Sequence, residues 1–265
     1  ASETNREAFA NDCQRVVNDF GLDGIDIDWE YPTQSGAGIS SSPEDTENFT
    51  LMMASLRKAL GRKHLLTAAT VADGKFIDFK SCIKYLDFVN VMAYDMASAP
   101  QHHSALYKSA HAGHITSAEA VDAHLKAGVP PDKLVLGMPF YGRGNQDDIL
   151  RDFVKTHYTG DKYFEHWDSV AQVPFISNEK GELVLGYENP RSLAIKCQYI
   201  IDHHLRGGMY WEYDNDNSQG DERQTLFLSL MKNKKATVPP RQILVLAERG
   251  GQHEAFTAAA LKWLE

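Results

Sequence analysis

Short runs of apolar residues alternate with amphipathic stretches along most of this chain. Five runs have the length of a buried strand: residues 24–29, 65–71, 88–94, 134–140 and 208–213. In other stretches apolar residues recur every three or four positions, as on one face of a helix: residues 9–20, 49–60, 116–127 and 190–205. Buried strands that alternate with helices pair in parallel. The pattern therefore predicts an α/β protein with a parallel sheet.

The pattern changes near residue 231. Residues 232–240 are rich in charge and end in two prolines, which is typical of a linker. Residues 241–265 then read as one strand, a turn with glycines and one amphipathic helix, which cannot bury a core of their own. We expect them to be the start of a second α/β domain, and we interpret the chain as a fragment of a longer protein.

Composition narrows the possible partners. Of the 265 residues, 43% are apolar and 24% charged, so we expect a soluble globular protein. The formal net charge is -9, so we expect no basic face that would bind nucleic acid or an anionic membrane. No apolar run reaches 18 residues, so no membrane span is expected, and the polar first five residues are not a signal peptide. Three cysteines without paired spacing favour buried thiols over disulfides or a zinc site: Cys13, Cys82 and Cys197.

The first apolar run carries three acids on one face. Residues two apart in a strand share a face, so Asp26, Asp28 and Glu30 point one way, and the intervening positions are apolar. Neighbouring carboxylates are then roughly 7 Å apart. Crowding and burial raise the pKa of at least one of them, which keeps a carboxylic acid ready to donate a proton. The pattern therefore favours an acid catalyst.

Two other interpretations of this acidic face remain open at this point. The acids can face solvent, although the fully apolar opposite face and the long loop after Pro32 argue against that. They can also bind a divalent cation through oxygen ligands, but no His or Asn joins them at a suitable spacing. We expect neither a metal nor another cofactor.

The segment 23–32, DGIDIDWEYP, looks like the signature of glycoside hydrolase family 18, the chitinases and their relatives. A match of this length is highly specific. Three later segments resemble the sixth, seventh and eighth barrel strands of the family, in family order: 91–95 (VMAYD), 136–143 (LGMPFYGR) and 207–212 (GGMYWE). Further short segments are similar to a small module inserted in many members: 167–168, 173–175 and 187–192. The resemblance covers residues 5–230.

The resemblance implies a (β/α)8 TIM barrel of the chitinase type, with a small α+β insertion over 145–206, before the last strand. If the acidic strand is the family's fourth, three strands and the Ser-x-Gly-Gly segment of the third are missing before it. We therefore expect residues 1–231 to form a partial barrel of strands four to eight. The family's habit also implies a secreted or periplasmic protein, and we expect a monomer.

The resemblance also implies a mechanism in which the substrate supplies the nucleophile. Glu30 protonates the glycosidic oxygen while the sugar's acetamido carbonyl attacks the anomeric carbon, and Glu30 then acts as base for water. Asp28 orients the acetamido N–H and shares a proton with Asp26. Tyr94 donates its hydroxyl to the same acetamido group.

Trp211 is expected to form the apolar floor under the sugar, and Asp95 to make a polar contact nearby. Other expected substrate contacts are Tyr31, Met92, Met138, Tyr141 and Arg143. His102 and His103 follow Asp95 in a loop, and we interpret them as loop or rim residues rather than ligands. Residues 96–100, MASAP, depart from the family, because many members carry a Trp in this loop on the leaving-group side.

The expected substrate is chitin or an oligosaccharide that contains N-acetylglucosamine. Two alternatives use the same acetamido chemistry: an endo-β-N-acetylglucosaminidase that cuts glycoprotein glycans, and a non-catalytic lectin. The intact Glu30 favours an enzyme, and the inserted module favours chitin, because it builds one wall of a deeper groove. A structural partner without a site leaves the acids unexplained. Residues 243–253 resemble the start of a trehalose-utilisation, amidotransferase-like domain, to which we assign no function.

Overall fold

The structure is a computed structural model that describes residues 2–36, 38–145, 148–150, 158, 160–216, 220, 225 and 228–230. The predicted linker and the predicted second domain, residues 232–265, lie outside these residues. The helices are α1 (Glu3–Phe20), α2 (Asp45–Leu60), α3 (Phe79–Cys82), α4 (Ser117–Ala127) and α6 (Pro190–Asp202), with short 3-10 helices at Pro131–Lys133 and Tyr213–Asn215. The strands are β1 (Gly24–Asp28), β2 (Leu65–Val71), β3 (Phe88–Met92), β4 (Leu134–Pro139), β5 (Tyr141–Arg143), β6 (Asp148–Leu150), β7 (Tyr163–Asp168), β8 (Val173–Asn178), β9 (Leu183–Gly186) and β10 (Gly207–Trp211).

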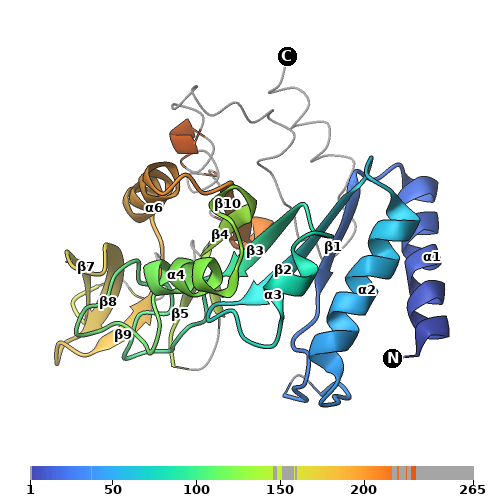
Figure 1. Cartoon of the computed structure of the whole chain (residues 1–265). Helices are drawn as coiled ribbons and strands as arrows, with labels where there is room; N and C mark the ends of the chain where they lie inside the picture. The colour runs from blue at the N-terminus through green and yellow to red at the C-terminus, as the bar shows by residue number, and fades with distance from the viewer. Residues whose placement is uncertain are drawn as a thin grey trace.

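The five strands predicted from the apolar runs form one sheet in the order β1-β2-β3-β4-β10. Every neighbouring pair in it is parallel, which confirms the predicted α/β arrangement. Because parallel strands run the same way, their carboxyl ends meet at one edge of the sheet (Figure 1). The described residues contain no closed barrel, since the order runs from β1 to β10 without a pair between these two strands.

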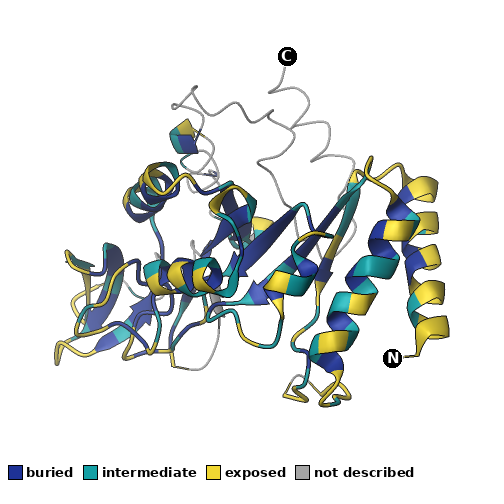
Figure 2. Ribbon diagram, in the orientation of Figure 1, coloured by how far each residue is buried: buried dark blue, intermediate teal, exposed yellow. Residues whose placement is uncertain are grey.

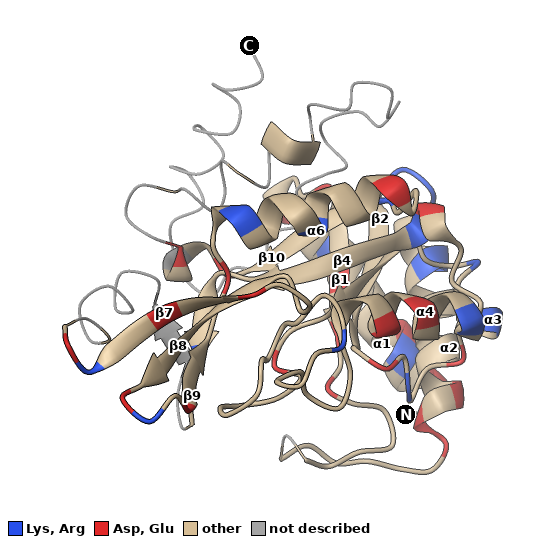
Figure 3. Cartoon of the chain, turned by 90° about the vertical axis from the view of Figure 1, so that its left-hand side faces the viewer, with Lys and Arg blue, Asp and Glu red and all other residues tan. Residues whose placement is uncertain are grey.

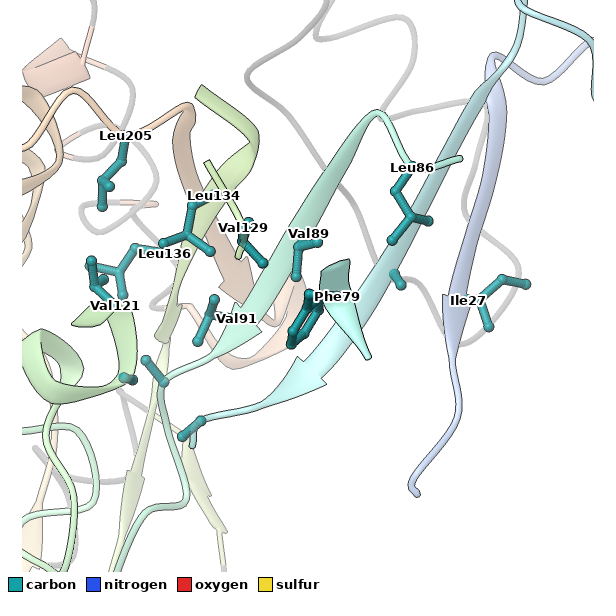
Figure 4. Close-up of a cluster of buried hydrophobic side chains, with 14 of the residues drawn as sticks. Ile27, Phe79, Leu86, Val89, Val91, Val121, Val129, Leu134, Leu136 and Leu205 are labelled. Atoms are coloured by element: carbon teal, nitrogen blue, oxygen red, sulfur yellow. The ribbon is translucent and has the colours of Figure 1, made fainter. Parts of the chain in front are cut away.

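The core lies between this sheet and the helices. Val89 and Val91 of β3 point toward Leu134 and Leu136 of β4 and toward Phe79 of α3, and all five are nearly inaccessible to water (Figure 4). Figure 2 shows the sheet as mostly buried, while each helix turns an exposed stripe outward. Helices α1 and α2 lie side by side next to β1 (Figure 1). The amphipathic pattern therefore places the helices as the sequence predicts.

Local signals in the sequence fix where several helices begin and end. Ser2 caps α1, and Gly21 ends it in the left-handed region at φ 63°, which glycine adopts without steric cost. Thr116 and Glu119 form a capping box at the start of α4. Asn189 caps α6, whose first residue is Pro190.

A second sheet is antiparallel and has the order β6-β5-β9-β8-β7. Its strands lie between β4 and α6 in the chain, so it falls largely in the segment expected to hold an insertion, although β5 already begins at Tyr141. A buried ion pair joins this sheet to α6, because the Lys196 ammonium contacts the Glu188 carboxylate just after β9. Lys196 also donates to the Ser104 carbonyl, and the Ser104 hydroxyl donates to Glu188 at 2.7 Å. These bonds offset part of the desolvation of the two charges.

The expectations from composition can be compared with the structure. All three cysteines are buried and free, as predicted. None of the described helices is both long enough and apolar enough to cross a bilayer. Acidic and basic positions are interspersed along α1, α2 and α4 (Figure 3), so these helices present no uniformly basic face. This distribution agrees with a partner other than nucleic acid.

Arg57 ties the end of α2 to the starts of β2 and β3. Its side chain is 8% exposed, and it donates to the carbonyls of Tyr85, Gly61 and His64 at 2.7–2.9 Å. It also pairs with the Asp87 carboxylate, which accepts the Leu66 N–H at 2.7 Å. Arg57 therefore satisfies three carbonyls and the partly exposed Asp87 carboxylate where the helix meets the sheet.

We expect Arg57→Met to destabilise the protein, because it leaves three carbonyls and the Asp87 charge without their donor. Removing one partner of a fully buried ion pair costs about 3–5 kcal/mol, and since Asp87 is 33% exposed we expect a loss below that range; a domain of this size loses about 2–4 °C in Tm per kcal/mol. Thermal unfolding followed by circular dichroism measures the shift. Lys58→Met, at an exposed neighbouring position of α2, is the control. Equal Tm values for the two variants would contradict the role of Arg57.

Candidate active site

A cleft of about 660 Å³ opens at the carboxyl ends of the parallel strands. Nine of the residues singled out from the sequence line it: Asp26, Asp28, Glu30, Tyr31, Met92, Tyr94, Asp95, Tyr141 and Trp211. They come from the ends of β1, β3 and β10 and from β5. Since the parallel pairing brings those ends together, residues up to 185 positions apart in the chain share one cavity (Trp211 against Asp26).

The acids of β1 lie on the cleft side of the strand. Asp28 and Glu30 are accessible to water, whereas Ile27, which lies between Asp26 and Asp28, is 8% exposed and packs in the core. Partial burial, followed by the charges of Glu30 and Asp26, raises the pKa of Asp28 to about 6. The predicted alternation of faces is confirmed, and Asp28 has the raised pKa that such crowding implies.

Asp26 lies deepest in the row, at a position that pairs in register with Thr67 of β2. The Thr67 hydroxyl and the Asn90 amide, the latter at 3.0 Å, both bond to Asp26 Oδ1. Water still reaches part of the side chain, but protein atoms surround the carboxylate on most sides. This desolvation raises the pKa of Asp26 in spite of the two hydrogen bonds. Asp26 is therefore a fixed carboxyl that favours holding a proton.

The sequence analysis missed Thr67 and Asn90. Both are buried and polar, and both interrupt otherwise apolar runs that form strands. That interruption was the available signal, because a polar side chain inside a buried strand requires a partner. The cleft also includes Asp73, Met96 and His114, which the sequence did not single out.

Tyr94 projects from the end of β3 toward the neighbouring strands. A Cβ atom on Gly137 of β4 would lie 2.9 Å from the Tyr94 ring and 2.3 Å from the Val91 carbonyl oxygen, so only glycine allows this close approach. The Tyr94 hydroxyl lies 3.9 Å from Met209 Sδ of β10. Burial, followed by the charge of Asp28, raises the pKa of Tyr94 well above its usual value. The phenol is thus held as a neutral donor beside the acids.

Asp95 has a left-handed backbone, at φ 55°. Tyr141 donates its hydroxyl to Asp95 Oδ1 at 2.7 Å, and Arg143 Nε reaches the same oxygen at 2.6 Å. Burial by itself raises the pKa of Asp95. Hydrogen bonds from His103, Tyr141 and Arg143 outweigh that effect and lower the pKa to about 2. Arg143 thus belongs to the site through Asp95 rather than as part of the cleft wall.

Tyr31 and Trp211 lie at opposite ends of the sheet order, after β1 and at the end of β10. The Tyr31 ring stacks on Phe76 at a centroid distance of 5.7 Å. Partial burial and then the hydrogen bond to Glu30 raise the pKa of Tyr31, so the phenol stays neutral. Trp211 is half-buried and leaves ring surface toward the cleft. The Glu30–Tyr31 and Trp211–Glu212 peptide bonds are both cis.

One expected substrate contact does not reach the cleft. Met138 is fully buried in the core, because it alternates in β4 with Gly137, which faces Tyr94, and so points to the helix side. His102 and His103 lie in the loop after Asp95, as expected, but each is 1% exposed, so they are buried in that loop and not at its rim. Their rings point inward, His102 to Asp168 at 3.1 Å and His103 toward Asp95.

The cleft therefore brings together an accessible carboxyl, two carboxyls with raised pKa, neutral phenols and an aromatic ring. Such a set suits acid-base chemistry on a neutral, polar ring molecule. Among the described residues no group of three or more His, Cys, Asp or Glu is arranged to hold a metal ion.

Comparison with known proteins agrees with this geometry. Chitinase A1 of Niallia circulans is 30% identical over 91% of this chain and 41% of its own length, and an endochitinase of Manduca sexta is 31% identical over 91% and 52%. The chain thus spans about half the length of these relatives. Among solved structures, a family 18 N-acetylglucosaminidase from Paenibacillus barengoltzii matches with a TM-score of 0.78 and 32% identity, over 86% of this chain and 77% of that one.

These structural neighbours indicate an α/β fold of the TIM-barrel-like kind, in which the parallel sheet and the strand-end cleft are shared features. The family model described as "Glycosyl hydrolases family 18" matches residues 1–216, which include every strand of the parallel sheet. The chain therefore belongs to glycosyl hydrolases family 18.

Proposed function

We propose that the protein hydrolyses β-1,4-linked N-acetylglucosamine chains, as in chitin, by a retaining, substrate-assisted mechanism. The observation that carries this proposal is the acidic row of β1, in which the pKa of Asp28 is raised to about 6 beside an accessible Glu30. Two relatives at 30% and 31% identity are named a chitinase and an endochitinase, which supports the same substrate class.

In this mechanism Glu30 gives its proton to the glycosidic oxygen as the bond from C1 to that oxygen breaks. The acetamido carbonyl oxygen of the same sugar forms a bond to C1, so the intermediate is an oxazolinium ion. Asp28 accepts a hydrogen bond from the acetamido N–H and stabilises the positive charge. Water then attacks C1, Glu30 removes its proton, and the acetamido group is released.

The remaining site residues fit supporting roles. Asp26, held by Thr67 and Asn90, exchanges a proton with Asp28 as the charge on the acetamido group changes. Tyr94 donates to the acetamido oxygen, and Trp211 packs against the apolar face of the sugar ring.

We further propose that β1 to β4 and β10 correspond to strands four to eight of the family barrel, and that the second sheet is the inserted module of that family. The order of the acidic strand, the Tyr94 strand and the Trp211 strand supports this assignment. By the same analogy the protein is a secreted or periplasmic monomer, and residues 232–265 are a linker and the start of a further domain.

A second candidate is cleavage of single N-acetylglucosamine units or short oligosaccharides. The solved structure at 32% identity is named an N-acetylglucosaminidase, and Trp211 is the one tryptophan among the described residues that line the cleft. A polymer needs aromatic surface on both sides of the cut, and the loop at 96–100 provides none. Cleavage of glycoprotein glycans and non-catalytic sugar binding are two further alternative functions. Non-catalytic binding conflicts with the intact Glu30.

We expect Glu30→Gln to abolish most hydrolysis, since glutamine keeps the shape but has no proton to donate. General acid catalysis contributes about 10²–10⁴-fold, so kcat on a chromogenic chitobioside should fall by that factor in the full-length protein. The variant should keep its affinity for chito-oligosaccharides, measured by Trp fluorescence. The matched control is Glu47→Gln, at an exposed position of α2.

Equal and negligible turnover by the wild type and the Glu30 variant, with binding retained in both, would instead indicate a lectin. A wild type that releases single sugars from the chain end, rather than internal fragments, would favour the second candidate over a chitinase.

The acidic row also reduces stability at neutral pH. Since the pKa of Asp28 rises from 3.8 to about 6 on folding, the folded state holds a proton that the unfolded state has released, and stability falls as pH rises through this interval. Asp28→Asn should therefore raise Tm at pH 7.5 by about 2–4 °C, a value reduced for solvent screening, and change it little at pH 4. Asp122→Asn on α4 is the control. A Tm gain at pH 4 as large as that at pH 7.5 would contradict this linkage.

A further inference from the structure

His103 lies behind Asp95, between the cleft and the second sheet. Its ring is 1% exposed, and Nδ1 lies 3.5 Å from Asp95 Oδ1 and 3.4 Å from the Asp95 backbone nitrogen. The His103 carbonyl accepts the N–H of Met96 at 3.0 Å. One residue thus contacts the side chain and the backbone of Asp95 and the backbone of the next residue.

The conformation of Asp95 requires support of this kind. A left-handed backbone at a residue other than glycine costs about 1–2 kcal/mol and persists where its surroundings hold it. The contacts from Tyr141, Arg143 and His103 all reach Oδ1, although these residues come from two separate segments. These contacts fix Oδ1 of a residue that lines the cleft.

We propose that His103 is a positioning residue that holds Asp95 in its substrate-facing conformation. His103 does not line the cleft, so it acts through Asp95 and does not touch the sugar. The role of Asp95 as a sugar contact rests on the proposed function, whereas the bonds that hold it do not depend on that function.

The chemistry of an imidazole suits both contacts of Nδ1. With a lone pair on Nδ1 the ring accepts the Asp95 N–H, and with a proton there it donates to the carboxylate. The described groups that face His103 and titrate or carry charge are Asp95, Tyr141, Arg143 and the adjacent His102. Gly186 of β9 brings its backbone against the ring without a charge. Hydrogen bonding from His103 helps to lower the pKa of Asp95.

His102 provides a matched control in the same loop. It is equally buried and also bonds to a carboxylate, but its partner is Asp168 of β7, in the second sheet. Loss of His102 therefore tests the general cost of removing a buried histidine from this loop. Loss of His103 adds the specific effect on Asp95.

The experiment compares His103→Phe, His103→Asn and His102→Phe in the full-length protein. We expect His103→Phe to lower kcat/KM on a chromogenic chitobioside by about tenfold, as for the loss of one hydrogen bond to a charged group. His103→Asn should recover most of the activity, since an amide can replace Nδ1. His102→Phe should leave kcat/KM close to that of the wild type.

A double-mutant cycle with Asp95→Asn completes the test. If His103 acts through Asp95, His103→Phe has little further effect on kcat/KM in the Asp95→Asn background. The same loss in both backgrounds, or no recovery of activity in His103→Asn, would overturn the proposal. The same cycle is then measured with the Kd for an oligosaccharide, followed by Trp fluorescence. A wild type without turnover would refute the proposed hydrolase but not the role of His103. Non-additive effects of the two substitutions on Kd would support that role, and additive effects would refute it.

Discussion

Parallel pairing of five strands is the constraint on which the rest of this structure depends. It aligns β1, β2, β3, β4 and β10 so that their carboxyl ends share one edge, and the cleft lies there. The register then decides which side chains meet, as where Asp26 of β1 pairs with Thr67 of β2. A shift of one residue would turn the acids of β1 into the core and Ile27 toward the cleft. The apolar face of β1 thus fixes the position of the acids that line the cleft.

Environment gives the carboxyls of the cleft different protonation states. Burial raises the pKa of Asp26, and burial together with the charges of Glu30 and Asp26 raises the pKa of Asp28 to about 6, whereas donors that converge on Asp95 lower its pKa to about 2. The first two carboxyls therefore hold a proton more readily than a free carboxyl, while Asp95 stays a fixed negative charge. This separation of roles suits a reaction in which positive charge forms and then disappears on the substrate.

Charged groups far from the cleft keep its walls in place. Arg57 closes the junction between α2 and two strands, and the Lys196–Glu188 pair fastens the second sheet to α6. Arg57, Lys196 and Glu188 are buried with hydrogen-bond partners and Asp87 is partly exposed, so the two pairs support one arrangement of the chain at the cost of desolvation. The left-handed Asp95 is held in the same manner by residues from separate segments. Rigid supports of this kind keep donors and acids at reacting distance.

The sequence by itself determined the strands, the helices and the alternation of acids on β1, because each depends on a period within one short segment. It also determined the order of the strand-end motifs, and hence nine of the cleft residues. The tertiary structure decided which way Met138 points, that His102 and His103 are buried, and that Thr67 and Asn90 hold Asp26. These outcomes depend on strand register and on contacts between segments far apart in the chain. A local pattern shows that a polar residue is unusual, but only the packed structure supplies its partner.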